Sequence, residues 1–317
     1  MHASLTIVLV LVLAGPPVPA PAQVPALELP AFVVGATTSE NDVIGNGNTC
    51  AGFIEERANL GEQLGIRRVF ANKGQLPPPD AIDCQHEYGA RLWYSFKTSC
   101  TPVAVAAGYC DGEILSVAAA MPEDGILTYF HEPEDDMTGV RFVRAFKRVY
   151  HLAKAINPAI DVVPVYMGFQ WRPESRLVTR NGTGGDREVR DWVVPSAFAD
   201  GYGLGLYWQA SARGTEPDDP VSIGRDPRML RWYNAFGALT RPLALAEWGI
   251  DDDLGVRASR GPAIRASRDW LVSHGFQIIC YWQHGNWYLG TSVTPPGGYP
   301  DPDGVAAYRE LVAAATS

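Results

Sequence analysis

Two glutamates stand where an apolar run of the sequence gives way to polar loop residues. Glu132 follows the run ILTYFH at 126–131, and Glu247 lies near the end of the run PLALAEW at 242–248. A protonated carboxyl that gives its proton to a leaving oxygen, opposite an ionised carboxylate that attacks a carbon, is the pair that breaks glycosidic bonds. The pattern therefore predicts that Glu132 and Glu247 form such a pair across one cleft.

Each glutamate also has a structural interpretation. Glu132 stands in the acidic run EPEDD, where a solvated charge is common, and Glu247 could form an ion pair with an arginine of the surrounding fold. Glu134 and Asp135 lie on the same loop as Glu132. Either would take its place if the preceding strand ended two residues later, which a sequence alone does not decide.

Several aromatic or titratable side chains stand beside these glutamates in the predicted cleft. Tyr207 ends the run YGLGLYW at 202–208, where it could hydrogen-bond Glu247 and keep it ionised and oriented. His131 could fix Glu132 or contact the sugar hydroxyl nearest the cleaved bond. Both also have a structural interpretation, Tyr207 as a core tyrosine and His131 as a satisfied histidine.

The chain contains 9 tryptophans, which is enough to line a cleft with indole rings. Trp282 ends the run QIICYW at 277–282 and is the preferred residue for stacking on the C–H face of a pyranose ring. Trp208, Trp248 and Trp171 are further candidates for the same role. Most tryptophans pack in cores, however, so a structural role for each of these three remains open.

The elements that must position these residues follow a repeated order of short apolar strand, polar loop and helix. The predicted strands are eight runs, at 31–37, 67–72, 91–96, 126–131, 161–167, 202–208, 242–248 and 277–282. Helical spacing is seen at 50–65, 138–157, 259–275 and 301–316. Eight such units predict an α/β fold, a single (β/α)8 TIM barrel over residues 24–317. An open doubly wound sheet is the alternative, but the sequence has no G-x-G-x-x-G after the first predicted strand.

In such a barrel, catalytic residues come from the carboxyl ends of the strands. Glu132 ends the fourth strand and Glu247 the seventh, on opposite sides of the barrel mouth. Two long loops, at 169–191 and 284–304, follow the fifth and eighth strands on the same face. We expect these loops to shape a cleft around the two glutamates.

Both glutamate motifs resemble those of the clan A retaining glycoside hydrolases, in which the acid/base follows strand 4 and the nucleophile follows strand 7. The motif His131-Glu132-Pro133 is similar to the Asn-Glu-Pro motif of that clan, with histidine replacing asparagine as in family 26, the endo-mannanase and related endo-glucanase group. Ala246-Glu247-Trp248-Gly249 is similar to the family 26 nucleophile motif, usually Ser-Glu-Phe-Gly. The acidic residues Glu134-Asp135-Asp136 depart from that family's pattern. The resemblance implies that Glu132 is the general acid/base and Glu247 the nucleophile. It also implies net retention, with the two carboxyls roughly 5 to 5.5 Å apart.

The N-terminus and the cysteines indicate export. The apolar run LTIVLVLVLA at 5–14, followed by Ala20-Pro21-Ala22, predicts a signal peptide over residues 1–23, although the absence of Lys or Arg before it leaves a membrane-retained N-terminus open. Export permits disulfides. We favour the pairs Cys50–Cys84 and Cys100–Cys110, with Cys280 a buried free thiol, while four cysteines allow three connectivities.

Composition and missing motifs narrow the function classes. A net charge of −9 argues against nucleic-acid binding, and no later apolar run approaches the length of a membrane span. There is no G-x-S-x-G or phosphate-binding loop, and the acidic runs at 134–136 and 251–253 lack the spacing of a calcium loop. We therefore expect a monomeric secreted glycosidase that acts on a β-linked polysaccharide or oligosaccharide and needs no metal or cofactor. The alternative hypotheses are a non-catalytic glycan-binding barrel of the cell envelope and an interaction protein retained there by its N-terminal segment.

Overall fold

All the strands of the computed structural model run parallel in one sheet. The model describes residues 32–37, 50–71, 73–172, 188–208, 222–251, 260–283, 289 and 301–315. The strands are β1 (Val33–Thr37), β2 (Ile66–Phe70), β3 (Arg91–Phe96), β4 (Ile126–Tyr129), β5 (Asp161–Val162), β6 (Val165–Met167), β7 (Tyr202–Trp208), β8 (Leu243–Ile250) and β9 (Phe276–Tyr281). Each of the eight predicted strands is present, with ends shifted by a few residues.

The segment 161–167, which was predicted as the fifth strand, closes the sheet into a barrel. The strand order is β5-β4-β3-β2-β1-β9-β8-β7-β6, and β5 and β6 are two halves of one predicted strand separated by Pro164. Proline has no N–H to donate, so it interrupts the ladder there. Its carbonyl still accepts from Gly203 N at 2.8 Å on the β7 side, while Val163 N donates to Leu127 O at 2.9 Å on the β4 side. The chain is therefore a (β/α)8 barrel, as predicted.

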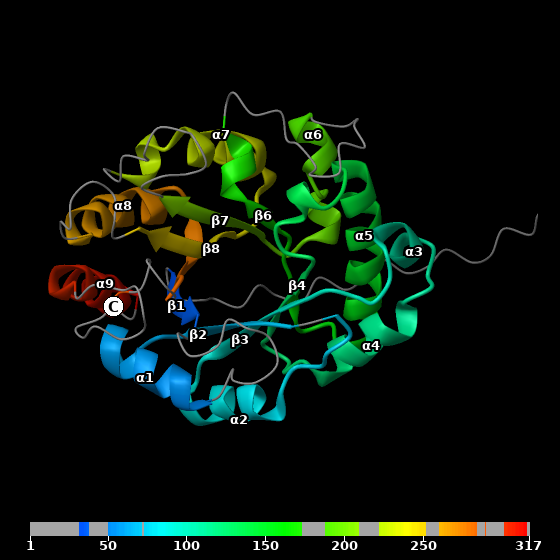
Figure 1. Cartoon of the computed structure of the whole chain (residues 1–317), viewed down its shortest axis with the longest axis horizontal. Coiled ribbons are helices and arrows are strands. Elements are labelled where there is room, and N and C mark those ends of the chain that lie inside the picture. The colour runs from blue at the N-terminus through cyan, green and yellow to red at the C-terminus, as the bar shows by residue number, and fades with distance from the viewer. Residues whose placement is uncertain are drawn as a thin grey trace, which may run out of the picture.

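The helices form a layer outside the sheet, as Figure 1 shows. They are α1 (Cys50–Leu60), α2 (Pro79–Tyr88), α3 (Pro102–Ala106), α4 (Asp111–Ala120), α5 (Gly139–Ile156), α6 (Val189–Trp192), α7 (Pro227–Phe236), α8 (Gly261–Ser273) and α9 (Pro302–Ala314). The four predicted helices correspond to α1, α5, α8 and α9. Within the described ranges, no helix combines the length and apolar character needed to cross a membrane.

Helix α5 illustrates why the periodic segments fold as predicted. The Thr138 side chain accepts a hydrogen bond from Arg141 N at 3.4 Å and so caps the first turn. Phe142, Phe146 and Val149 then recur at helical spacing and are all buried against the sheet. The helix ends before Pro158, which cannot continue it.

The inside of the barrel is filled by its own small cluster of side chains. The cluster contains Ile66, Trp93, Ile126, Val163, Val165, Ala244, Ala246, Ile278 and Cys280. The Trp93 indole N–H donates to Thr128 Oγ1 at 2.8 Å, and that hydroxyl donates to Val163 O at 2.8 Å. Because the interior is packed rather than hollow, reactive groups are confined to the carboxyl ends of the strands.

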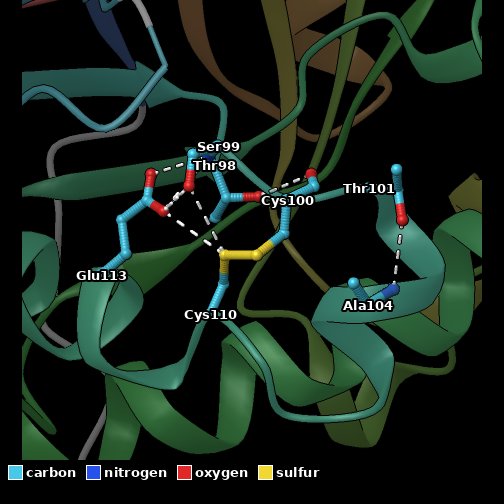
Figure 2. Close-up of a disulfide and its surroundings, with 7 residues drawn as sticks. All are labelled: Thr98, Ser99, Cys100, Thr101, Ala104, Cys110 and Glu113. Carbon is cyan, nitrogen blue, oxygen red and sulfur yellow. Dashed lines mark hydrogen bonds between the residues drawn. A yellow bond between two sulfur atoms is a disulfide. The ribbon is translucent and has the colours of Figure 1, made fainter.

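Two disulfides fasten the first third of the chain, and both match the favoured pairing. Cys50–Cys84 joins α1 to α2, and Cys100–Cys110 joins the segment after β3 to the start of α4. Cys280 is free and buried, as predicted. Figure 2 shows Glu113 beside the second disulfide, where its carboxylate accepts from Ser99 N at 2.9 Å and Ser99 Oγ at 2.8 Å.

Parts of the predicted organisation lie outside the described residues. These are the signal peptide at 1–23 and most of the two long loops. The described ends of the first loop are the 3₁₀ turn η2 (Gly168–Trp171) and helix α6. Of the second loop, only Leu289 and the residues from Asp301 onward are described.

The two disulfides should differ in their contribution to stability. They close segments with sequence separations of 34 and 10 residues. Because a longer loop loses more entropy when closed in the unfolded chain, removing Cys50–Cys84 by double alanine substitution should cost about 1 kcal/mol more than removing Cys100–Cys110. Urea unfolding of both double variants without reductant measures this difference. Equal losses, or a larger loss for the shorter loop, would contradict the expectation.

Candidate active site

Glu132 and Glu247 face one another across Gly205, a residue of β7. Glu132 Oε1 lies 2.6 Å, and Glu247 Cβ 3.7 Å, from the point that a Cβ atom on Gly205 would occupy. Gly205 is paired with Glu247 in the sheet, on the strand next to β8. Any side chain at position 205 would therefore fill the space taken by the Glu132 carboxyl. The predicted approach of residues 132 and 247 is present in the structure.

The backbone that carries Glu132 is unusual. Phe130 and Glu132 both adopt left-handed conformations, with φ of 51° and 54°. Such conformations cost non-glycine residues about 1–3 kcal/mol and persist where surrounding contacts impose them. Here Phe130 N donates to Phe96 O at 2.8 Å, and Glu132 N donates to Val165 O at 2.9 Å. The turn thus binds to strands on both sides of β4, and His131 lies between its two left-handed residues.

Glu247 is nearly buried, and each of its carboxylate oxygens has a partner. The Arg68 guanidinium lies 2.7 Å from Oε1, and the Tyr207 hydroxyl donates to Oε2 at 2.5 Å. The hydrogen bond predicted between Tyr207 and Glu247 is therefore present. The ion pair considered as the structural alternative for Glu247 is present as well. Arg68 also donates to Ala246 O at 3.0 Å, which fixes the pair against β8.

Arg68 was not identified from the sequence, although the signal was available. In β2, Ile66, Arg68 and Phe70 alternate with Arg67 and Val69, so Arg68 shares the face of Ile66, which lies inside the barrel. Its guanidinium carbon lies 4.8 Å from the Phe70 ring and 4.6 Å from the Trp93 ring. A charged residue on the inward phase of a buried strand marks a site where a partner of opposite charge is required.

The two carboxyl groups have different electrostatic surroundings. Loss of hydration raises the pKa of Glu132 well above its usual value, and the negative charges of Glu247 and Glu134 add to the effect. Burial lowers the pKa of His131, which Arg68 and Lys97 reinforce. Burial also raises the pKa of Tyr207, followed by the charge of Glu247. The surroundings therefore favour the protonated form of Glu132 and the neutral form of His131, opposite the Glu247 carboxyl that is paired with Arg68.

Aromatic rings surround this carboxyl pair. The Phe70 ring lies 4.9 Å from the His131 ring and 5.5 Å from the Trp282 ring, both edge-on. Trp282 also meets the Tyr207 ring at 6.0 Å. The structure thus brings together His131, Tyr207 and Trp282, three of the predicted binding residues, and adds Phe70, which the sequence analysis missed. Trp282 remains partly exposed, as a platform for a ligand requires.

The other three predicted tryptophans do not reach the site. Trp171, Trp208 and Trp248 are 0–1% exposed and pack in the core, which corrects the expectation that they stack on sugar. Trp208 and Trp248 directly follow Tyr207 and Glu247, so the alternation of a strand turns them to the opposite, helix-covered face. The Trp208 indole donates to Asp226 Oδ2 at 2.7 Å, beneath the first turn of α7.

The runner-up acids Glu134 and Asp135 are engaged elsewhere. Both lie in the 3₁₀ turn η1 (Pro133–Asp135), directly after Glu132. Glu134 is completely buried and accepts from Met167 N and the Trp171 indole, and Asp135 accepts from Gln170 Nε2. Neither carboxyl is held toward Gly205, so Glu132 is the residue of this turn that faces Glu247.

Comparisons by sequence give no relatives. No protein-family model matches the chain, and no curated protein matches it.

Comparisons by structure give similar folds. An endo-β-1,4-mannanase from Thermotoga petrophila has a TM-score of 0.60 at 12% identity, over 92% of this chain and 78% of that chain. An endo-1,4-β-mannanase from Rhizomucor miehei has a TM-score of 0.61 at 12% identity, over 90% and 95%. A GH5 endoglucanase of broad specificity from an uncultured bacterium has a TM-score of 0.57 at 10% identity, over 90% and 95%.

These likenesses concern the fold. The similar structures are glycoside hydrolases of the barrel type, which agrees with the clan that the two glutamate motifs resemble. Membership of family 26 in particular is not supported, because the GH5 endoglucanase belongs to a different family and no sequence match singles one out.

The raised pKa of Glu132 should appear in the pH dependence of stability. Between the ordinary pKa of a glutamate and its raised folded value, the folded state binds more protons than the unfolded state, so stability falls as pH rises. Glu132→Gln removes this loss. We expect the variant to gain stability over the wild type between about pH 4 and pH 8, the range above an unperturbed carboxyl pKa. Urea unfolding at both pH values tests this, with the exposed Glu123→Gln as control; a pH-independent difference for Glu132→Gln would contradict it.

The buried ion pair should be strongly coupled. Arg68→Met leaves Glu247 buried without its cation and should lower the free energy of unfolding by about 3–5 kcal/mol. Adding Glu247→Gln removes the uncompensated charge and should recover part of that loss. A double-mutant cycle from urea unfolding measures the coupling. Additive effects of the two substitutions would show that the pair contributes nothing beyond its separate members.

Proposed function

We propose that this protein is a secreted retaining glycoside hydrolase that cleaves O-glycosidic bonds within a β-linked polysaccharide. The observation that carries the proposal is the meeting of Glu132 and Glu247 beside Gly205, where the surroundings raise the pKa of Glu132 and Arg68 pairs with Glu247. A proton donor and a carboxylate nucleophile on the two sides of a scissile bond are what double displacement requires.

In the first step, a Glu247 oxygen attacks the anomeric carbon and forms a covalent glycosyl ester. The glycosidic C–O bond breaks, and Glu132 gives its proton to the departing oxygen. In the second step, the ionised Glu132 takes a proton from water, and the water oxygen attacks the same carbon. The ester bond to Glu247 breaks, and Glu132 is protonated again. Two inversions give net retention.

The surrounding residues support these steps. Arg68 and the Tyr207 hydroxyl orient both oxygens of Glu247 and offset its charge. His131, neutral by virtue of its lowered pKa, can hydrogen-bond a sugar hydroxyl without repelling a developing positive charge at the anomeric carbon. Trp282 is partly exposed and packs beside the Phe70 ring, so its indole can stack on a sugar.

The substrate class and the location are part of the proposal. The similar structures are named as endo-acting mannanases and an endoglucanase, which supports an endo-acting enzyme on a neutral β-linked glycan. The N-terminal apolar run supports secretion, and the two disulfides suit an oxidising compartment. We propose a monomer that needs no metal or cofactor, since the two carboxyls supply the whole reaction.

The nucleophile assignment is tested with Glu247→Ala. After a screen of polysaccharides for reducing-end release, kcat/KM is measured on the matching 2,4-dinitrophenyl glycoside. We expect a loss of at least about 10⁴-fold, because the covalent step is removed. Azide should restore turnover and give a glycosyl azide of inverted configuration. NMR of the first anomer released by the wild type should show retention.

Glu132→Ala is the matched comparison. Azide should then give the azide of retained configuration, because the covalent intermediate still forms on Glu247. Unchanged turnover in Glu247→Ala would end the assignment. Binding of a glycan without any hydrolysis by the wild type would instead favour the alternative, a non-catalytic glycan-binding barrel.

A further inference from the structure

The acidic run after Glu132 contains a buried carboxylate that the proposed reaction does not use. Glu134 is 0% exposed, although it lies only two residues beyond Glu132. Its oxygens accept from Met167 N at 3.0 and 3.1 Å, and Oε1 also accepts from the Trp171 indole at 3.0 Å. A buried carboxylate is retained only where donors compensate it, so this cluster is a built feature of the turn.

These contacts fasten the turn to the neighbouring strand at two points. Glu132 N donates to Val165 O at the start of β6, and the Glu134 side chain accepts from Met167 N at its end. These two hydrogen bonds lie at the two ends of β6. One involves Glu132, whose conformation is left-handed, and the other involves Glu134, two residues further along the chain. Gln170 Nε2 donates to Asp135 and adds a third tie, to η2. The strained backbone of Glu132 is therefore held by contacts on both sides of it.

The position of Glu132 leaves little room for error. Its Oε1 lies 2.6 Å from the point where a Cβ on Gly205 would be, so a small displacement of the turn moves the carboxyl out of the gap beside Glu247. A misplacement of about 1 Å in a catalytic group can cost about a hundredfold in rate.

We propose that Glu134 is a positioning residue for Glu132, which acts by tying the turn to β6 and η2. The inference rests on the proposed function, since it assigns Glu134 a part in the proton transfer by Glu132.

Charge supports the same role. The charged groups facing Glu132 are Glu247 on β8, Arg68 on β2, and Glu134 and Asp135 on η1, with Tyr207 on β7 also close. The carboxylates raise the pKa of Glu132 and Arg68 lowers it. Burial raises the pKa of Glu134 itself to about 8, against hydrogen bonds from Trp171 and Met167. Glu134 is therefore ionised only at alkaline pH, above about 8, where its charge opposes loss of the proton from Glu132. Without that charge, Glu132 should lose its proton at lower pH.

The test uses Glu134→Gln, which keeps an acceptor for Trp171 and Met167 but cannot ionise. Asp136→Asn is the matched control, because it replaces a carboxyl by an amide at the exposed end of the same turn. For each, kcat/KM is measured against pH on two aryl glycosides, one with a 2,4-dinitrophenol leaving group and one with an unactivated phenol. Because kcat/KM reports the first step, only the second substrate depends on the proton from Glu132.

For Glu134→Gln we expect a loss of about tenfold to a hundredfold on the unactivated substrate and less than about threefold on the activated one. The alkaline limb of its pH profile should move down by roughly one unit. Asp136→Asn should match the wild type. Equal losses on both substrates with an unmoved alkaline limb would overturn the proposal, because a merely structural role predicts that result.

Trp171→Phe keeps the test decisive should Glu134→Gln not fold, as judged by thermal unfolding. It removes one donor to Glu134 and keeps the carboxyl, so the same selective loss on the unactivated substrate is expected. No selective loss in either variant overturns the proposal. If the wild type hydrolyses no glycoside, the proposed function itself fails. If the wild type is active and Glu132→Ala behaves as an acid/base variant, wild-type kinetics in Glu134→Gln reject this inference alone.

Discussion

Two carboxyl groups in one water-poor space repel each other, and both lose hydration. A fold that brings Glu132 and Glu247 together must therefore treat them differently. Glu247 receives a cation and a hydroxyl, from Arg68 and Tyr207, which compensate its charge. Glu132 faces Glu247 and Glu134 as well as Arg68, and it keeps its proton through a raised pKa. The asymmetry between the two carboxyls is the condition on which any acid/base chemistry here depends.

The barrel supplies that asymmetry by geometry. Neighbouring strands direct alternate side chains inward, so Arg68 from β2 and Glu247 from β8 meet above the packed interior. Gly205 on β7 leaves the gap that the Glu132 carboxyl occupies. Loss of hydration is unfavourable for each of these polar groups taken singly, and their mutual contacts are what make their common burial possible.

The sequence was sufficient for the strands, the barrel and the pair of glutamates, because each depends on local periodicity or on where a strand ends. It also indicated Tyr207, His131 and Trp282 correctly as neighbours of the pair. Trp208 and Trp248 were misassigned because aromatic type was considered without the inward or outward phase of the strand. Arg68 and Phe70 were missed because the sequence analysis did not ask which residues of β2 point into the barrel. The position of Trp171 depends on its hydrogen bond to Glu134, a residue distant in the sequence, so no local pattern could reveal it.

The turn after β4 shows how one acidic run can contain residues with opposite physical roles. Sequence alone leaves Glu132, Glu134 and Asp135 nearly equivalent, because their type and spacing are alike. The left-handed conformations of Phe130 and Glu132 redirect the chain, so that the Glu132 carboxyl points to Gly205 while Glu134 meets donors from β6 and η2. Backbone strain in this turn is maintained by those same donors, since without them a non-glycine residue would relax to an ordinary conformation. Glu132 is the carboxyl of the turn that faces Glu247, and Glu134 is the one that is bound by donors of the neighbouring elements.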